Sequence, residues 1–445
     1  MLMSPISSIL ITILAIVSTL PIFWKLVHHR RIDIFEPINL SSLYFFLLFV
    51  LRPIYDLTLE SEFLGALPFD NATESAFNLA LLYAVFGFIA FLFGYYLSWN
   101  KKIASSLPNI PRNWDTSTFN YTSFILLAFG IFLQGLLIQS FGGFEVYLGN
   151  KQETLTAGGQ GYLSLGLFLI NFVFAAHVTQ FLTKGSSKIT LFLVLLPCLL
   201  LLGFISGSKG QFINPLLCFT TLWNYLKTPI RPIIVVLGAA AAIFLFPIFN
   251  IYRHTEDVLL LVESVGNFFS SADTELLIDH FMSRFHTFDS LVYAVRDTPK
   301  VMDFQYGQTI LPLIIVWIPR QLWVDKPTVG FGKIFAESYY VDYFSGTGTS
   351  ASVGIIGEGY INFHVFGVLL FPFIFGIFAK VIYIYFIQKN SGLPALAIYS
   401  TFILYILAFW EADVSGFLSA RLFSLVCVFS FVWIMGRHPR KKLSQ

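Results

Sequence analysis

The sequence predicts an all-α fold: a polytopic membrane helical bundle of about eleven transmembrane helices, with 10–13 as the range. Of its 445 residues, 56% are hydrophobic and 12% are charged, and 51 are Phe. A soluble protein could not cover this much apolar surface. Apolar stretches near the length that crosses a bilayer recur along the whole chain, and every second connection between them is basic. The chain is therefore expected to form a single transmembrane domain over residues 1–445.

The expected spans are apolar stretches of roughly the 20 residues that a membrane helix needs: 5–24, 38–56, 76–97, 119–141, 162–182, 189–206, 211–226, 232–251, 353–379, 393–411 and 415–435. The first shows no basic segment ahead of it and no small-residue cleavage site, so we interpret it as a retained helix. The apolar segment 309–319 is too short to cross, and we expect it to be re-entrant or interfacial.

The orientation follows from the basic residues, which concentrate in cytoplasmic loops. They follow every second span, at Lys25, Arg30, Arg31, Lys101, Lys102, Arg112, Lys184, Lys188, Lys227, Arg231, Lys389 and the tail Arg437–Lys442. In the intervening connection 57–75, all the charged side chains are acidic. We expect the N-terminus outside the cell membrane and the C-terminus in the cytoplasm.

This topology places residues 252–352 on the outer side as a large, partly helical loop. Connections this long are usually functional or disordered, and the aromatic content of this one predicts that it folds against the membrane. The net charge of +2 gives no support for nucleic-acid binding. The three cysteines lie in apolar stretches without the spacing of a zinc site, so they are expected to be core residues.

Basic side chains on the outer side, against the orientation rule, are candidate functional groups. Lys209 lies in the turn Ser206–Gly210 between two spans. The helix start, the serines and the lysine together predict an anion site. The alternative is a Gly/Ser turn whose lysine reaches for the membrane surface.

Two arginines lie within or at the end of spans. Arg253 ends the eighth span and could grip a phosphate through two hydrogen bonds; the alternative is an interfacial anchor beside Tyr252. Arg421 lies about two turns into the last span. It could line a cavity, or it could form an internal salt bridge with Glu411 or Asp413.

Arg284, His286 and Asp289 lie within two helical turns of one another. On a helix, positions 286 and 289 share a face. Either side chain could act as an acid or a base, because His titrates near neutrality. The alternative is a surface His–Asp pair with no role in chemistry.

The stretch Trp317–Pro327 has prolines near both ends that restrict the backbone. Trp323 suits a membrane interface or the face of a sugar, and Arg320 and Lys326 add positive charge at the same level. The alternative is an interfacial hairpin. Glu358 is an isolated carboxylate among glycines at the start of the ninth span. It could act as a base, and the alternative is a helix cap or a structural ion pair with an arginine.

Three of these segments resemble the Wzy-type O-antigen and oligosaccharide repeat-unit polymerases: the Ser206–Gly210 turn, the Pro319–Pro327 stretch, and Gly357–Phe363 entering a span. Their order fits the family, and the resemblance covers most of residues 190–425. Related sequences often carry Arg in the turn where this chain has Lys209, which keeps the charge but loses the planar two-point grip.

The resemblance implies a glycosyltransferase of the integral-membrane, lipid-sugar-using kind in a bacterial inner membrane, with a periplasmic N-terminus. The donor is a glycan on undecaprenyl diphosphate and the acceptor is one lipid-linked repeat unit. An acceptor hydroxyl attacks the anomeric carbon and the lipid diphosphate leaves, with no metal and no cofactor. A chain-length regulator and a flippase are the protein partners that fit this pathway.

Fixed cations at a leaving diphosphate lower the barrier. We therefore expect Lys209, Arg253, Arg284, Arg320, Lys326 and Arg421, with Trp323, to bind the diphosphate and glycan. Glu358 is preferred as the base over His286 and Asp289. Two other functions fit the same pattern: an O-antigen ligase, and a lipid-linked sugar flippase or other transporter, although no internal repeat supports a transporter.

Overall fold

The computed structural model describes residues 4–29, 32–59, 70–149, 163, 165–185, 189–255, 258–271, 274–315, 318, 323, 326, 330–340 and 351–436. Within these ranges the chain is helical, and its β-pairing is one isolated bridge between Trp114 and Gly436. The all-α prediction is confirmed.

The first half of the chain contributes α1 (Pro5–Val27), α2 (Pro37–Phe46), the π-helical turn η1 (Leu47–Leu51), α3 (Arg52–Leu59), α5 (Asn71–Tyr96), α6 (Trp99–Ser106), α7 (Thr116–Ser140), α8 (Phe144–Gly149), α10 (Leu165–Lys184), α11 (Ile189–Ile205) and α12 (Lys209–Leu226). The second half contributes α13 (Pro232–His254), α14 (Val258–Ser271), α15 (Thr274–Met282), the 3₁₀ turn η2 (Ser283–Phe285), α16 (Thr287–Asp297), α17 (Pro312–Ile315), α18 (Phe331–Tyr339), α20 (Gly354–Tyr383), the π-helical turn η3 (Ile384–Lys389), α21 (Leu393–Ala408) and α22 (Val414–Met435).

Eight described helical stretches are long and apolar enough to cross a membrane: Pro5–Val27, Pro37–Thr58, Asn71–Tyr96, Ser117–Ser140, Leu165–Lys184, Pro232–Tyr252, Gly354–Lys389 and Val414–Met435. The protein is therefore a multi-pass membrane protein. The other three predicted spans also form helices, α11, α12 and α21, but these are shorter or less apolar.

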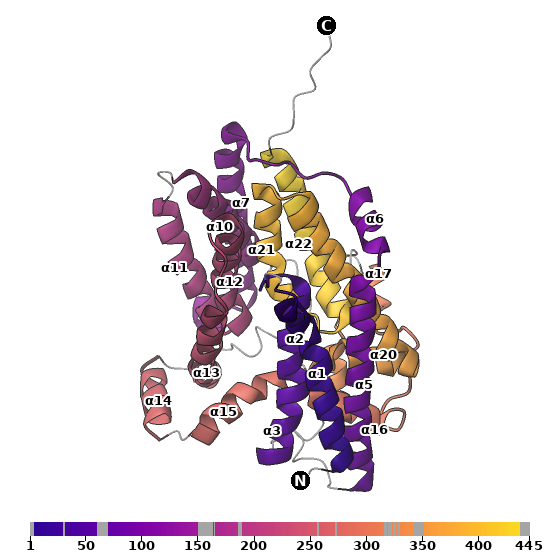
Figure 1. The fold of residues 1–445 in the computed structure, drawn as a ribbon. Coiled ribbons are helices and arrows are strands. Elements are labelled where there is room, and N and C mark those ends of the chain that lie inside the picture. The colour runs from indigo at the N-terminus through magenta and orange to yellow at the C-terminus, as the bar shows by residue number, and fades with distance from the viewer. Residues whose placement is uncertain are drawn as a thin grey trace.

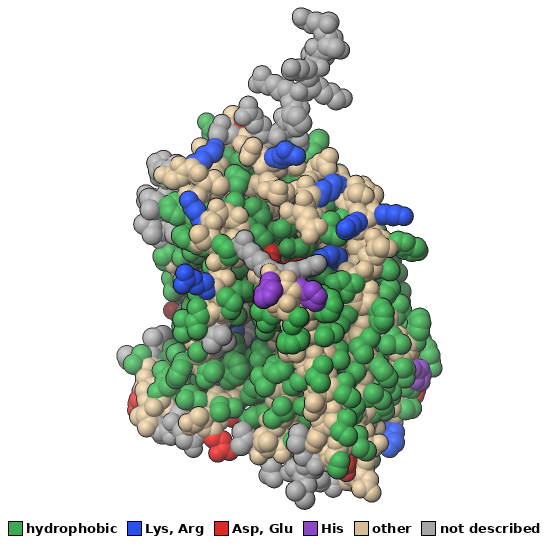
Figure 2. All heavy atoms as spheres, in the orientation of Figure 1, with side chains coloured by type: hydrophobic (Ala, Val, Ile, Leu, Met, Phe, Trp, Pro, Cys, Tyr) green, Lys and Arg blue, Asp and Glu red, His purple; other side chains and the backbone are tan. Residues whose placement is uncertain are grey.

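The predicted basic connections meet at one end of the bundle. Lys25 and Lys380 both bind Glu36, at 2.6 and 3.3 Å. Lys389 donates to the carbonyls of Ala104, Ser105 and Leu107. The backbone of Asp115 bonds to that of Met435 at 2.8 Å, where α22 ends. On the flank in Figure 2, blue side chains gather above a broad hydrophobic zone, and red ones lie mostly below it.

Segment 252–352 contains α14, α15, η2, α16, α17 and α18 among its described residues. Figure 1 shows α14, α15, α3 and α16 together at the end opposite α6 and the end of α22. Helix α16 is almost entirely buried and packs on α5 and α20. This region is thus partly folded into the bundle.

Helix α20 is not one straight rod. Phe363 and His364 leave helical geometry, and the backbone of Gly359 comes so close to Gly367 that a Cβ there would lie 2.4 Å from its carbonyl oxygen. Residues eight apart in a straight helix would be separated by about 12 Å. The expected span 353–379 therefore begins with a separate helical segment that folds back on the spanning one.

Aromatic side chains form the centre of the core. Trp410 is fully buried, and its ring lies 4.8 Å from Phe45, 5.1 Å from Phe91 and 5.4 Å from Phe375, centroid to centroid. These partners come from α2, α5 and α20. The connection between α21 and α22 is thereby anchored to three helices, which positions the next residue, Glu411. The three cysteines were predicted to be core residues. Cys218 is buried, but Cys198 is exposed, so this prediction was wrong for Cys198.

Candidate functional site

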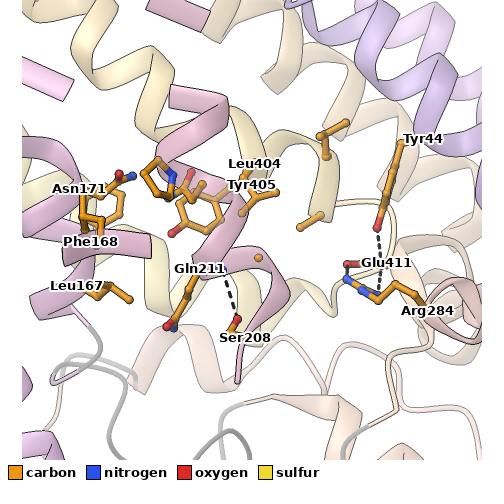
Figure 3. Close-up of a pocket in the computed structure, with 16 residues that line it drawn as sticks. Tyr44, Leu167, Phe168, Asn171, Ser208, Gln211, Arg284, Leu404, Tyr405 and Glu411 are labelled. Atoms are coloured by element: carbon orange, nitrogen blue, oxygen red, sulfur yellow. Dashed lines mark hydrogen bonds and ion pairs between the residues drawn. The ribbon is translucent and has the colours of Figure 1, made fainter. Parts of the chain in front are cut away.

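A pocket of about 330 Å³ opens between helices α10, α12 and α21 and the Ser283–Phe285 turn. Both polar and apolar groups line it: Tyr44, Leu167, Phe168, Asn171, Leu199, Ser208, Gly210, Gln211, Asn214, Pro215, Arg284, Leu404, Tyr405, Leu407, Ala408 and Glu411. In Figure 3, Gln211 and Ser208 lie in the middle of the view, and Tyr44, Arg284 and Glu411 form a group on one side. Polar side chains from five segments far apart in sequence thus converge on one hollow.

The charged part of the pocket is a two-point ion pair. Both terminal nitrogens of Arg284 donate to the Glu411 carboxylate, one of them at 2.8 Å, and the Tyr44 hydroxyl donates to the same carboxylate at 2.7 Å. The Arg284 side chain keeps 36% of its surface exposed, whereas that of Glu411 keeps 12%. The Glu411 carboxylate raises the pKa of Arg284, although burial acts against it. Arg284 is therefore a permanent cation that a ligand can reach.

The Ser206–Gly210 turn forms the neighbouring part of the wall. Gly207 has φ +67, a left-handed conformation that glycine adopts without a Cβ clash. The Ser206 side chain accepts from the Ser208 amide at 3.3 Å, and the Ser208 side chain accepts from the Gln211 amide at 3.4 Å. The turn thus reaches the pocket, because its residues Ser208 and Gly210 line it. However, the two serine side chains occupy two of the amides that the predicted anion site needs.

Lys209 itself is buried outside the pocket lining. Its ammonium lies 4.7 Å from the centre of the Phe246 ring on α13, a cation–π distance. Its positive charge is therefore behind the pocket wall, and the predicted phosphate contact through Lys209 stays a prediction.

Asp289 and His286 sit next to Arg284 along the chain but face other partners. Asp289 is fully buried and receives two hydrogen bonds from Arg52, at 3.1 and 2.5 Å. Burial lowers the pKa of His286, and Arg284 adds to this effect while Asp289 opposes it. Asp289 thus belongs to a buried cluster, whereas His286 is half-buried at the start of α16, and neither residue lines the pocket.

Glu358 holds three segments together. It is fully buried; the Thr309 hydroxyl and the Val414 amide each donate to its carboxylate at 2.6 Å. Asn362 donates to Thr309 at 2.8 Å and extends the network. The carboxylate therefore accepts a hydrogen bond from the free amide at the start of α22 and ties the 306–311 turns to α20, as expected for a structural cap.

The remaining predicted site residues lie in the second half of the outer segment and in the spans. Lys326 is buried and donates to the Ile318 carbonyl at 2.9 Å, while Trp323 is 39% exposed. Arg320 lies outside the described residues.

Arg253 lies in α13 and Arg421 in α22, but their side chains are outside the described part of the chain. The short apolar segment begins with turns and α17, as its interfacial prediction allows.

The sequence reasoning missed most of the polar lining: Tyr44, Asn171, Gln211, Asn214 and Tyr405 lie on helices that it treated only as spans. For Glu411 the sequence suggests only a salt bridge with Arg421. Asn171, Gln211 and Asn214 carried a usable signal, because polar amides inside apolar spans tend to face the bundle interior.

A family model described as "O-antigen polysaccharide polymerase Wzy" matches residues 1–442. The chain belongs to the Wzy family of O-antigen polysaccharide polymerases. It polymerises O-antigen repeat units, and so is a membrane-embedded polymerase of the glycosyltransferase type. No curated protein and no solved structure matches the chain.

For a Wzy-family polymerase, the pocket offers two complementary groups within one wall. The Arg284 guanidinium presents paired donors of the kind that recognise phosphate or carboxylate. The Glu411 carboxylate can accept a proton from a hydroxyl. Amide and hydroxyl side chains on α10 and α12 can bind sugar hydroxyls beside them. Among the described residues, no three His, Cys, Asp or Glu side chains are grouped to hold a metal.

Proposed function

We propose that the pocket between α10, α12 and α21 is where this Wzy-family chain joins repeat units carried on undecaprenyl diphosphate. The observation that carries the proposal is the Arg284–Glu411 ion pair in the wall of a polar pocket, beside the Ser206–Gly210 turn. A cation that stays accessible within a largely apolar protein is costly unless it serves a ligand or a partner. Here both a partner and an open hollow are present.

In the proposed reaction, an acceptor sugar hydroxyl attacks the anomeric carbon of the donor glycan. The new carbon–oxygen bond forms while the bond to the lipid diphosphate breaks, and the electron pair leaves on the diphosphate oxygen. Arg284 binds that growing negative charge; one well-placed donor of this kind is worth roughly 2.7–4 kcal/mol. The acceptor's proton passes to a carboxylate.

Glu411 is the carboxylate that the geometry favours for this proton. It lines the pocket, whereas Glu358, His286 and Asp289 do not. In the resting protein Arg284 and Tyr44 occupy its oxygens. A diphosphate would compete with Glu411 for the Arg284 donors, so donor binding would loosen the ion pair and make the carboxylate available.

The lipid chain has a place beside the pocket. An apolar groove of about 440 Å³ runs along the other face of α21, between that helix, α20 and α22. Tyr405 lines both the pocket and the groove. We assign the isoprenoid chain to this groove, because its phenylalanine and leucine lining leaves few polar atoms for any other ligand.

The proposed topology has eleven spans, with α11, α12 and α21 added to the eight long ones, a periplasmic N-terminus and a cytoplasmic C-terminus. The clustering of Lys25, Lys389 and the exposed Lys101, Lys102 and Arg112 at one end supports it. The pocket then faces the periplasm, where a chain-length regulator and a flippase would act. No metal is required in the proposed reaction, since Arg284 supplies the positive charge.

The test is complementation of a polymerase-null strain, with glycan length on a gel as the readout. Arg284→Ala and Glu411→Gln should each reduce polymerisation by about a hundredfold while the protein still inserts. Lys333→Ala is the matched control, because it removes a cation from an exposed pair with Glu337 away from the pocket. A normal ladder from Arg284→Ala would overturn the proposed site, and a reporter after residue 300 that reads cytoplasmic would overturn the topology.

A further inference from the structure

Arg52 is a fully buried arginine whose guanidinium contacts both sides of the bend that carries Arg284. Its Nη1 donates to the Met282 carbonyl at 2.8 Å, at the end of α15. Its Nε and Nη2 donate to the two oxygens of Asp289, in the first turn of α16. The residues between these contacts are 283–288, which include the pocket cation.

Two more contacts from the same helix support this bend. Asp56, one turn along, lies 3.0 Å from the Arg52 Nε and adds a second carboxylate. Tyr55 donates to Asp279 in α15. Helix α3 is therefore joined to α15 and α16 by charge-assisted bonds within a buried region, where such bonds are strong and a broken partner is costly.

The other end of this helix touches the same bend from the pocket side. The Tyr44 ring lies 6.1 Å from the Phe285 ring, and its hydroxyl binds Glu411, the partner of Arg284. Tyr44 and Arg52 are thus on one continuous helix and contact one short segment. Residues 282–289 are held from both sides by α2 and α3.

The π-helical turn η1 between them explains how both residues face the bend. Tyr44 and Arg52 are eight positions apart, and at about 100° per residue a regular α-helix would rotate them about 80° out of line. The turn Leu47–Leu51 takes up one more residue than an α-helical turn. The pair then behaves as if about seven positions apart, within about 20° of two full turns.

We propose that Arg52 is a positioning residue for polymerisation: by binding Met282 and Asp289 it holds the bend in the geometry that points Arg284 into the pocket. The proposal rests on the proposed role of Arg284 as the diphosphate contact. Arg52 itself does not line the pocket and touches no substrate. It acts through the position of Arg284, so its loss should affect the same step that Arg284 serves.

The experiment is a double-mutant cycle on the purified full-length protein, with farnesyl diphosphate as the binding probe and glycan synthesis as the second readout. Arg284→Lys should weaken probe binding about tenfold, because it loses the two-point grip. Arg52→Gln should weaken it about tenfold as well. The two together should be no more than about twofold worse than either alone, because both changes remove the same interaction.

A residue that only stabilises the fold would give a different pattern. Its loss would leave the probe affinity of the folded fraction unchanged, or its fold-loss of affinity would multiply with that of Arg284→Lys in the double variant. Either result overturns the proposal. Glu36→Gln is the matched control, since it breaks an ion cluster with Lys25 and Lys380 at the opposite end of the bundle. Its probe binding should equal that of the wild type.

Arg52→Lys and Asp289→Asn serve if Arg52→Gln does not accumulate as folded protein. Lysine keeps the charge beside Asp56 and Asp289 but cannot reach the carboxylate and the Met282 carbonyl together. Either variant should weaken binding severalfold and show the same lack of additivity with Arg284→Lys. If Arg284→Lys leaves probe binding unchanged, the proposed function of the pocket fails. If Arg284→Lys weakens probe binding but the Arg52 and Asp289 variants do not, the positioning role fails.

Discussion

Arg284 and Glu411 are 127 positions apart in the sequence, yet they form a two-point ion pair at the pocket wall. Arg284 comes from a short turn in the long outer segment, and Glu411 from the connection between the last two helices. Each is fixed by its own anchor: Trp410 in the aromatic core holds Glu411, and Arg52 holds the bend around Arg284. The pair therefore connects two parts of the fold that both pack on the Pro37–Thr58 helix, one through Phe45 and the other through Arg52.

Tyr44→Phe should lower the polymerisation rate per folded protein by at least about tenfold. The change removes one hydrogen bond to the Glu411 carboxylate, and bonds to charged groups contribute roughly 1.5–3 kcal/mol. Glycan synthesis per folded protein is the measurement. Tyr383→Phe is the matched control, because it removes the same hydroxyl from Asp33 at the other end. Equal effects of the two changes would argue against a role for the pocket.

Glu358→Ala should lower the free energy of unfolding by about 1–3 kcal/mol for each donor left without an acceptor. Those donors are the Thr309 hydroxyl and the Val414 amide. Glu358→Gln keeps one carbonyl oxygen as an acceptor, so its free energy of unfolding should lie between those of Glu358→Ala and the wild type. Thermal unfolding in detergent measures the stability. The polymerisation rate per folded protein should equal that of the wild type. Full stability combined with lost activity in Glu358→Gln would instead identify Glu358 as the base.

His286 should make the protein less stable as the pH falls below about 6.5, the ordinary pKa of histidine. Burial lowers its pKa in the folded state, so the unfolded chain binds the proton first and stability decreases from that pH down to the folded pKa. Arg284 and Arg52 favour the neutral ring, while Asp289 opposes them. His286→Asn should flatten the melting temperature between pH 7 and 5. An unchanged pH dependence would show that His286 does not titrate in this way.

Lys209→Met should weaken diphosphate binding less than Arg284→Ala does. Methionine is a flexible apolar side chain that can fill the buried space beside the Phe246 ring, and the lost charge lies behind the pocket wall. Binding of farnesyl diphosphate to both variants gives the comparison. A larger loss from Lys209→Met would place the ammonium on the ligand and support the phosphate cradle predicted from the turn.

The membrane class, the helix positions and the functional family could all be read from the chain because they depend on local properties. Apolar length and loop charge act residue by residue, so α5, α10 and α22 lie where their hydropathy puts them. The site was predicted in part. Arg284 and the Ser206–Gly210 turn do share a pocket, but Glu358 and Asp289 proved to be buried in structural networks, because a carboxylate's partners are not visible in sequence.

What the sequence determined by itself is that this chain lies in a membrane as a bundle of helices, and which short segments carry charge where lipid disfavours it. Only the tertiary structure decided which of those charges face an open pocket and which face each other. The physical reason is that the interaction energy of a charge depends on atoms within a few ångströms. These atoms come from distant parts of the chain: Glu411 for Arg284, Asp289 for Arg52 and Val414 for Glu358.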